Sequence, residues 1–211
     1  NALSEWLQVE VHREGKRHTM AFERGAMSQE MRSQPDSSKT GTSVTFLPDP
    51  KVFTETEFKF EILQARLREL AYLNSGLRIR LIDELHSKEC EFCFEEGLRE
   101  FCAHIAGGAE WLHKEAILIR DADEPAGISC QVVLLFTDSY SENILCFANN
   151  IHNIHGGTHM SALKASVSRV AGNYAKKNNL IKGNTNITGD DWREGLTAIV
   201  SVKLRDPKFE A

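Results

Sequence analysis

Three cysteines and one histidine in the middle of the chain have a spacing that could hold a metal ion. They are Cys90, Cys93, Cys102 and His104, in the pattern C-x2-C-x8-C-x-H. Closely spaced thiolates can share one tetrahedral zinc ion. However, Phe92 and Phe94 alternate with the first two cysteines as in a strand, which would turn the two thiols to opposite faces. We therefore expect small buried side chains here rather than zinc ligands.

A second group of candidate ligands lies in NNIHNIHGGTHMSALKA, residues 149–165, and consists of His152, His155 and His159. Imidazole suits first-row metal ions, but no carboxylate or thiolate lies close by in the sequence to complete a ligand set. The glycine pair Gly156-Gly157 gives the backbone freedom to turn, and the Thr158 hydroxyl could cap a helix that starts there. The pattern favours a hinge that leads into a helix over a metal site.

Other sets of residues are compatible with ligand binding and equally with ordinary turns. Lys39-Thr40-Gly41-Thr42 could contact a nucleotide, because glycine allows close approach and a hydroxyl can bond a base or a bound water. Asp190-Asp191 could be acids at a helix start or a cation site, and Arg193-Glu194 an ion pair that holds a helix to the last strand. The sequence contains no P-loop, no G-x-G-x-x-G motif, and no distinctive set for acid–base or nucleophilic catalysis.

Composition indicates a soluble globular chain that is large enough for one large domain or two small ones. The 211 residues are 41% hydrophobic and 26% charged. No apolar run approaches the roughly 18 residues that cross a bilayer, and no secretory signal is present. Five cysteines without a dense framework suit a reducing compartment, so we expect a cytoplasmic protein without disulfides. The chain starts without a methionine, inside what reads as a helix, which suggests a piece of a longer protein.

The net charge of -5 is unevenly distributed, since residues 1–150 are acidic and residues 151–211 are basic. The basic side chains of the last part include Lys164, Arg169, Lys176, Lys177, Lys182, Lys203 and Arg205. They could face a polyanion such as DNA, with counterion release as the driving force. A solvated helix face with ordinary lysines is the alternative.

The first half of the chain alternates between strand and helix patterns. We expect a hairpin over residues 7–22 with a turn at 13–16, a polar connection or lid over 25–40, and a strand over 41–47. A helix follows over 53–75, with Thr54 and Glu57 at capping-box spacing.

The second half predicts another mixed arrangement. A strand pair over 77–94 is followed by a helix over 98–113, then by three strands of an antiparallel meander between residues 116 and 149. The helix over 158–177 has an apolar stripe of Met160, Leu163, Val167, Val170 and Tyr174. A buried strand at 196–204 ends an α/β chain, of α+β two-layer type, with a boundary near residues 96–97.

Several strings together resemble the B subunits of bacterial DNA gyrases, which are type II topoisomerases. The strings are Asn1–Ser4, REGK at 13–16, KTGT at 39–42, FTETEF at 53–58, LRELAYLNSGLRIRLID at 67–83, NN at 149–150, GGTH at 156–159 and TGDDWREGLTAIVSVKLRDPKFE at 188–210. They run nearly from end to end, and REGLTAIVSVK is more like gyrase than like topoisomerase IV.

The resemblance implies that residues 1–96 are the later half of a GHKL-type ATPase sandwich and residues 97–211 a transducer domain with the fold of ribosomal protein S5 domain 2. In the family, two B subunits close on ATP and Mg²⁺ as a gate that captures DNA, and the transducer relays nucleotide state to the cleaving core with the A subunit. The implied partners are therefore DNA, the gyrase A subunit and a second B subunit, with no membrane.

The resemblance also implies which site residues lie within the chain. Arg13 corresponds to the rim of the adenine pocket, while Gly41 and Thr42 hold adenine through a hydroxyl and a water. The catalytic glutamate, the magnesium-binding asparagine and the lysine that reaches the terminal phosphate lie outside the chain, so we expect no catalytic residue, no bound ATP and no hydrolysis in this piece alone. The alternatives are a topoisomerase IV subunit or a non-catalytic, metal-binding interaction module.

Overall fold

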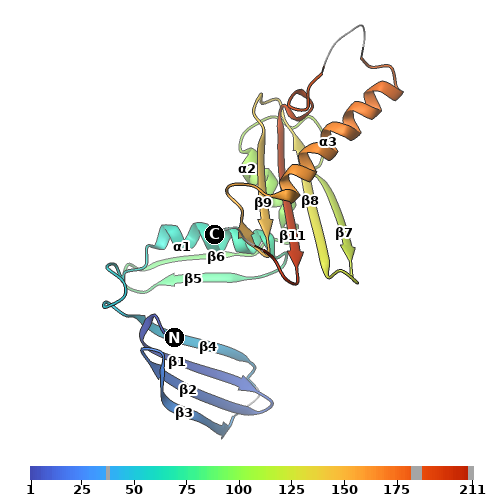
Figure 1. Ribbon diagram of the computed structural model, residues 1–211. Coiled ribbons are helices and arrows are strands. Elements are labelled where there is room, and N and C mark those ends of the chain that lie inside the picture. Colours follow the sequence, from blue (N-terminus) through green and yellow to red (C-terminus); the bar gives the residue numbers. More distant parts are fainter. Residues whose placement is uncertain (37–38, 182–186, 209–211) are drawn as a thin grey trace. The chain divides into compact units, whose positions relative to one another are not determined.

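The computed structural model describes residues 1–36, 39–181 and 187–208. The chain divides into two compact units, residues 1–59 (unit 1) and residues 60–211 (unit 2), which are seen in Figure 1. The boundary expected near residues 96–97 lies inside unit 2. Within the described ranges, no helix is long and apolar enough to span a bilayer.

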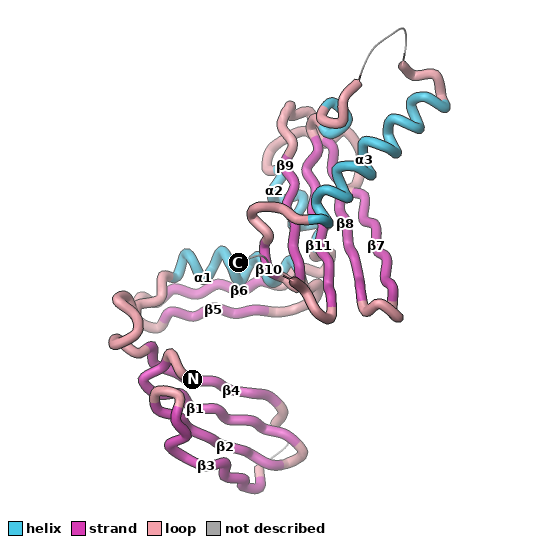
Figure 2. Tube along the Cα trace, viewed as in Figure 1, coloured by secondary structure: helices cyan, strands magenta, loops and turns pink. Residues whose placement is uncertain are grey.

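Unit 1 is a four-stranded antiparallel sheet in the order β3-β2-β1-β4 (Figure 2). Its strands are β1 (Ser4–Arg13), β2 (Lys16–Glu23), β3 (Ala26–Pro35) and β4 (Gly41–Pro48). The predicted hairpin is confirmed, with Arg13 paired to Lys16. The turn residues Glu14 and Gly15 both have positive φ, 54° and 70°, and this backbone matches the twist of the flanking strands.

Two expectations for unit 1 were wrong. The segment at 25–40, expected as a polar connection, contains β3, and the expected helix around residues 1–7 is the start of β1. β3 is an edge strand whose residues are mostly exposed, so its sequence carries no apolar alternation that would reveal it. At the chain start, the alternation of Leu7, Val9 and Val11 simply extends back to Ser4.

Unit 2 begins with α1 (Phe60–Leu73) and the hairpin of β5 (Ile79–Asp83) and β6 (Lys88–Phe92). The helix starts later than expected, so Thr54 and Glu57 precede it and form no capping box at its first turn. Near this start Phe58 and Ile62 are exposed, at 61% and 65%, whereas Phe60 and Leu63 are half-buried. Only the last turn, with Ala71, Tyr72 and Leu73, is buried.

The rest of unit 2 is a five-stranded sheet in the order β10-β9-β11-β8-β7. Its strands are β7 (Ile117–Asp123), β8 (Ile128–Phe136), β9 (Asn143–Ala148), β10 (Ile151–His152) and β11 (Leu196–Leu204). The helical elements are α2 (Leu98–Ala106), α3 (Thr158–Lys177) and the 3-10 turn η1 (Asp191–Arg193). The expected meander was wrong, because β11 lies between β8 and β9 and runs parallel to β9. A parallel neighbour requires a long crossover, which α3 supplies.

Helices cover both faces of this sheet, as Figure 1 shows, and alternate residues of β11 face alternate cores. On the α2 side, Phe101 and Cys102 pack with Val133, Phe147 and Ile199. The core on the α3 side consists of Cys146, Leu163, Leu196, Ala198 and Val200, with Met160 and Val167 beside it. The predicted stripe on α3 is thus only partly correct, since Val170 and Tyr174 are 63% and 64% exposed.

At two positions of unit 2 glycine is required, because a carbonyl oxygen of another segment lies close to where a Cβ would be. Gly195, just before β11, has φ 73°, and a Cβ there would lie 2.4 Å from the Thr137 carbonyl oxygen. Gly97 has φ 55°, and a Cβ would lie 3.0 Å from the carbonyl oxygen of Tyr72. Both positions therefore combine a left-handed backbone with a lack of space for any side chain.

Candidate functional site

The three residues expected to contact a nucleotide lie at one end of the unit 1 sheet. Arg13 ends β1 and is largely exposed, with its Nε 3.1 Å from Glu14 Oε1. Gly41 and Thr42 begin β4, where they pair with His12 and Val11 of β1. Because directly paired residues point to the same face, Arg13 and Thr42 share the face of Val11. Gly41 has φ 148°, and among the described residues other than its chain neighbours no atom lies within 4 Å of where its Cβ would be.

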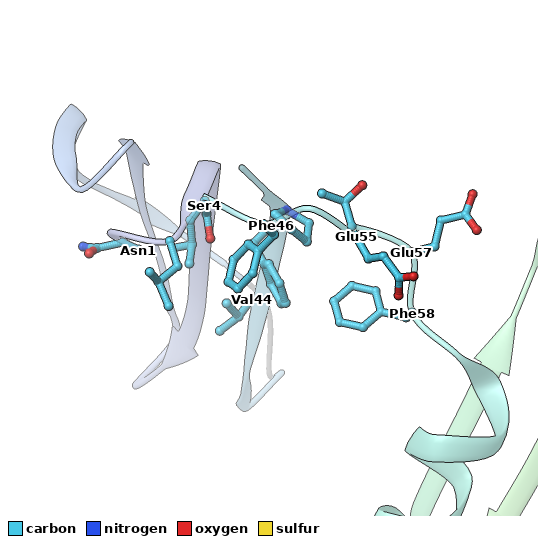
Figure 3. A pocket seen from close by; sticks show the side chains of 12 residues that line it. Asn1, Ser4, Val44, Phe46, Glu55, Glu57 and Phe58 are labelled. Atoms are coloured by element: carbon cyan, nitrogen blue, oxygen red, sulfur yellow. The ribbon is translucent and has the colours of Figure 1, made fainter. Parts of the chain in front are cut away.

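An apolar wall continues from Thr42 along this face. Val44 and Phe46 follow on β4, and they line an open hollow of about 460 Å³ together with Leu3, Leu7, Phe53 and Phe58 (Figure 3). The Phe46 and Phe58 rings meet edge to face with centroids 6.1 Å apart. Neither Arg13, Gly41 nor Thr42 lines the hollow itself. Val44 and Phe46 are the alternating residues from which β4 was predicted, but no role in binding was predicted for them.

The opposite face of the sheet holds a charged network that the sequence interpretation missed. His12 bridges two carboxylates: its Nε2 lies 2.7 Å from Glu10 Oε1, and its Nδ1 is bonded to Asp36. Arg17 Nη2 lies 2.6 Å from the other Glu10 oxygen. The hydrogen bond to Glu10, followed by that to Asp36, raises the pKa of His12, and the same bond lowers the pKa of Glu10. The network therefore ties Asp36, which follows β3, to His12 of β1.

The cysteines do not assemble as the zinc alternative requires. Cys102 is fully buried, its Sγ lies 3.5 Å from the Thr197 carbonyl oxygen, and burial raises the pKa of its thiol to about 12. In the part of the chain that the structure describes, no group of three His, Cys, Asp or Glu side chains could hold a metal ion. The expectation of small buried side chains holds for Cys102, while Cys90 and Cys93 are only half-buried.

The stretch GGTH leads into α3, as predicted, but by a different capping arrangement. The cap residue is Gly157, and the Thr158 hydroxyl makes no capping hydrogen bond, so that prediction was wrong. Gly156, with φ 84°, makes the turn. His159 lies in the first turn, and burial lowers the pKa of its imidazole.

The basic segment expected from the sequence lies mainly on and around α3. Arg169, Lys176 and Lys177 are exposed, whereas Lys164 forms an ion pair with Glu142 at 3.1 Å. Lys203 and Arg205 lie at the end of β11, and Lys182 falls outside the described residues. Arg193 is not paired with Glu194 as expected. It bonds Glu142 at 2.8 Å, Ser168 Oγ at 2.7 Å, and Asp190.

Comparison with known proteins identifies the family. The family model described as DNA gyrase B matches residues 97–211. The chain belongs to the DNA gyrase B family. Among curated B subunits of DNA gyrase, the chain is 44% identical over 211 residues to that of Clostridium acetobutylicum and 45% identical over 213 residues to that of Halalkalibacterium halodurans. Each alignment covers 100% of this chain and 33% of the relative, so the chain spans about a third of their length.

Solved structures of the family share the fold of this chain. The 43K ATPase domain of Thermus thermophilus gyrase B, in complex with an aminocoumarin, matches with a TM-score of 0.87 and 43% identity over 99% of this chain and 57% of that one. The topoisomerase IV ATP-binding domain of Francisella tularensis, in complex with a small-molecule inhibitor, matches with a TM-score of 0.81 and 26% identity over 100% of this chain and 57% of that one. The mixed α/β fold of gyrase B ATPase domains is therefore the fold of this chain.

Proposed function

We propose that this chain is part of a DNA gyrase B protein, in an ATP-dependent type II topoisomerase that negatively supercoils DNA, and that it relays nucleotide state to the DNA-cleaving core. The observation that carries this proposal is the identity of 44–45% to DNA gyrase B proteins along the whole chain. The family model described as DNA gyrase B, which matches residues 97–211, favours gyrase over the topoisomerase IV alternative.

Within this function, Arg13, Gly41 and Thr42 contact the base of ATP. The local residues suit that role, because Gly41 has no side chain to keep a flat group from the backbone and the Thr42 hydroxyl can bond a ring nitrogen directly or through water. Val44 and Phe46 continue the same face and would pack against the base. Mg²⁺ is proposed as a cofactor of the whole protein, because the resemblance implies it for the family.

The two proposed domains have different roles: residues 1–96 belong to the ATPase part, and residues 97–211 belong to the transducer. The start of the family match at residue 97, where Gly97 precedes α2, supports this boundary. DNA, the gyrase A subunit and a second B subunit are the proposed partners, in the cytoplasm. The exposed cations Arg169, Lys176 and Lys177 on α3 supply charge of the sign that DNA attracts.

The decisive experiment uses the whole parent protein reconstituted with its A subunit. We expect relaxed plasmid to become negatively supercoiled when ATP is added. Relaxation or unlinking without supercoiling would assign the chain to topoisomerase IV, and no ATP-dependent change in topology would leave a non-catalytic interaction module.

The base contact is tested in the same protein by Thr42→Ala. Losing the hydroxyl should raise the KM for ATP about five- to tenfold, the effect of one hydrogen bond. The matched control is Thr45→Ala, because Thr45 is also exposed on β4 but pairs with Gln8 on the opposite face. An equal effect of the two substitutions would contradict the assignment of Thr42.

A further inference from the structure

The turn that joins β9 to β10 is made by two asparagines in an unusual backbone conformation. Asn149 has φ 49° and Asn150 has φ 65°. Two successive left-handed residues form the tight turn that fits an antiparallel strand pair, and asparagine tolerates this conformation better than most residues. A turn alone would leave both side chains free to face solvent, yet both are used in contacts with other elements.

One side of the turn is bonded to α1. Arg66, in the middle of α1, donates from Nη2 to the carbonyl oxygen of Asn150 at 2.8 Å. The Asn150 Nδ2 donates to Asn74 Oδ1 at 3.3 Å, and Asn74 Nδ2 in turn donates to the Leu70 carbonyl oxygen at 2.8 Å. Asn74 thus satisfies a free carbonyl of the last turn of α1 while it holds the β9–β10 turn. Two independent hydrogen bonds therefore connect α1 to Asn150.

The other side of the turn is bonded to the end of β11. Asn149 Nδ2 donates to the Leu204 carbonyl oxygen at 2.9 Å, and the Leu204 amide donates to Asn149 Oδ1 at 2.8 Å. The Asn149 amide donates to the Val202 carbonyl oxygen at 2.9 Å. One side chain thus makes the same pair of bonds with Leu204 that a neighbouring strand would make. The end of β11 is fixed to the turn rather than left to fray.

A row of neighbouring rings joins the same elements through the core, stacked in every pair except Phe101–Phe147, whose planes are tilted by 44°. The rings, in order, belong to Phe94, Tyr72, Phe101, Phe147 and His152. Tyr72, at the end of α1, stacks on Phe94 at 3.7 Å and on Phe101 of α2 at 4.8 Å. Phe147 of β9 then lies 5.0 Å from His152 of β10, measured between ring centroids. The polar contacts of the turn therefore lie beside a packed aromatic connection, which restricts independent movement of α1 and the sheet.

We propose that the Asn149–Asn150 turn is a coupling element that ties the end of β11 to the position of α1, so that a displacement of α1 is transmitted to β11. This inference rests on the proposed function, because it makes the turn a connection between the ATPase part, which contains α1, and the transducer, which contains β11. Arg66, Asn74, Asn149 and Asn150 act as positioning residues and touch no substrate. The alternative is a turn whose bonds stabilise only its own loop.

Hydrogen exchange in this chain separates the two possibilities. Leu204 is the reporter, because its amide bonds Asn149 and touches neither Arg66 nor Asn74. If the turn couples α1 to β11, Arg66→Met and Asn74→Ala should each raise the exchange rate of the Leu204 amide about threefold or more. The matched control is Arg68→Met, since Arg68 is on the same helix but lies over the Phe92 ring, with its Cζ 5.2 Å from the centroid. It should leave Leu204 unchanged.

Unchanged exchange at Leu204 in both Arg66→Met and Asn74→Ala would overturn the coupling. As a positive control, Asn149→Gly keeps the left-handed backbone, removes the bonds to Leu204, and should release its amide. In the whole parent protein with its A subunit, Asn150→Gly should lower the number of supercoils per ATP hydrolysed several-fold while ATP hydrolysis persists. An unchanged ratio would contradict the coupling, whereas absence of ATP-dependent supercoiling in the parent would contradict only the proposed function.

Discussion

Arg193 is a buried guanidinium whose bonds join three segments of unit 2. Its Nε donates to Glu142, which precedes β9, its Nη1 donates to Ser168 Oγ on α3, and its Nη2 donates to Asp190, which lies just before η1. Only 9% of its side chain is exposed, so water can replace few of these bonds. The arginine therefore connects the crossover helix α3 to η1 and to the start of β9.

Replacing this arginine should cost considerable stability. We expect Arg193→Met to lower the free energy of unfolding of unit 2 by about 2–4 kcal/mol, because it removes three side-chain bonds of a guanidinium that is 9% exposed and leaves Glu142 with Lys164 as its remaining ion-pair partner. Urea unfolding followed by far-UV circular dichroism measures the change. Arg169→Met, on the exposed face of α3, is the control and should stay within about 0.5 kcal/mol. Equal effects of both substitutions would show that the bonds of Arg193 contribute no net stability.

His12 should titrate at a higher pH in the folded chain than in the unfolded one. Its pKa is raised by the hydrogen bonds to Glu10 and Asp36, with Arg17 as the nearby cation of the network. A raised pKa in the folded state means that its contribution to stability is complete below the unfolded value of about 6.5 and is lost as the pH rises through the folded value. Unit 1 should therefore become less stable as the pH increases through this interval.

NMR titration of the His12 ring, in the native chain and in concentrated urea, measures both values. The native pKa should exceed the value in urea, and Glu10→Gln should bring it part of the way back, because Glu10 is the main cause. Gln8→Glu is a suitable control, since it adds a carboxylate on the same face of β1 without a bond to His12. Identical titration in the native and urea states would contradict the network.

The role of a single residue could be predicted from the sequence where that role depends on the backbone conformation of neighbouring residues. The turn at Glu14-Gly15 and the start of α3 after Gly157 follow from glycine and strand alternation near them in the chain. The network of His12 with Asp36 was not predictable, because its members come from β1 and from the end of β3, a strand that carries no pattern of its own. The partner of Arg193 was missed for the same reason, since Glu142 is far from it in the sequence.

Among the elements, α3 has an apolar stripe of which only one part packs on the sheet. Met160, Leu163 and Val167 pack on β9 and β11, but Val170 and Tyr174 extend past the sheet. We expect Leu163→Ala to destabilise unit 2 by about 2–4 kcal/mol, because it leaves a cavity against Cys146 and Val200. Val170→Ala should change the free energy of unfolding by less than about 0.5 kcal/mol. Urea unfolding of the two variants in parallel tests the assignment, and a larger loss for Val170→Ala would refute it.

The order of the strands was the element-level feature that the sequence could not determine. Periodicity identified β7, β8, β9 and β11 individually, and the β7–β8 pairing follows from their short connection. The insertion of β11 between β8 and β9 depends on α3 packing across the sheet as a crossover, which is a property of the assembled layers. Strand patterns alone cannot distinguish this arrangement from a meander, because both bury the same residues.

At the scale of the whole molecule, the two units differ in how many hydrophobic residues they bury. Every buried hydrophobic residue among the described ones belongs to unit 2, whereas the buried residues of unit 1 are the polar Ser4 and Asp49. Asp49 is held by the Lys51 amide and by Arg24, at 2.9 and 2.7 Å. The apolar face of unit 1 stays open, with Val44 at 54% and Phe46 at 47% exposure. Among its described residues unit 1 has no helix of its own to pack on this sheet, so the unit by itself has little hydrophobic stabilisation.

We therefore expect the two units of this chain to open independently. Amides of β1–β4 should exchange at least about tenfold faster, relative to their intrinsic rates, than amides of β8 and β11. Hydrogen exchange followed by mass spectrometry resolves the units, and a series of protein concentrations controls for self-association through the open face. Since β8 and β11 are flanked by strands and covered by α2 and α3, their protection should report global unfolding of unit 2. Equal protection of both units at every concentration would mean that unit 1 is stabilised by contacts other than its own sheet.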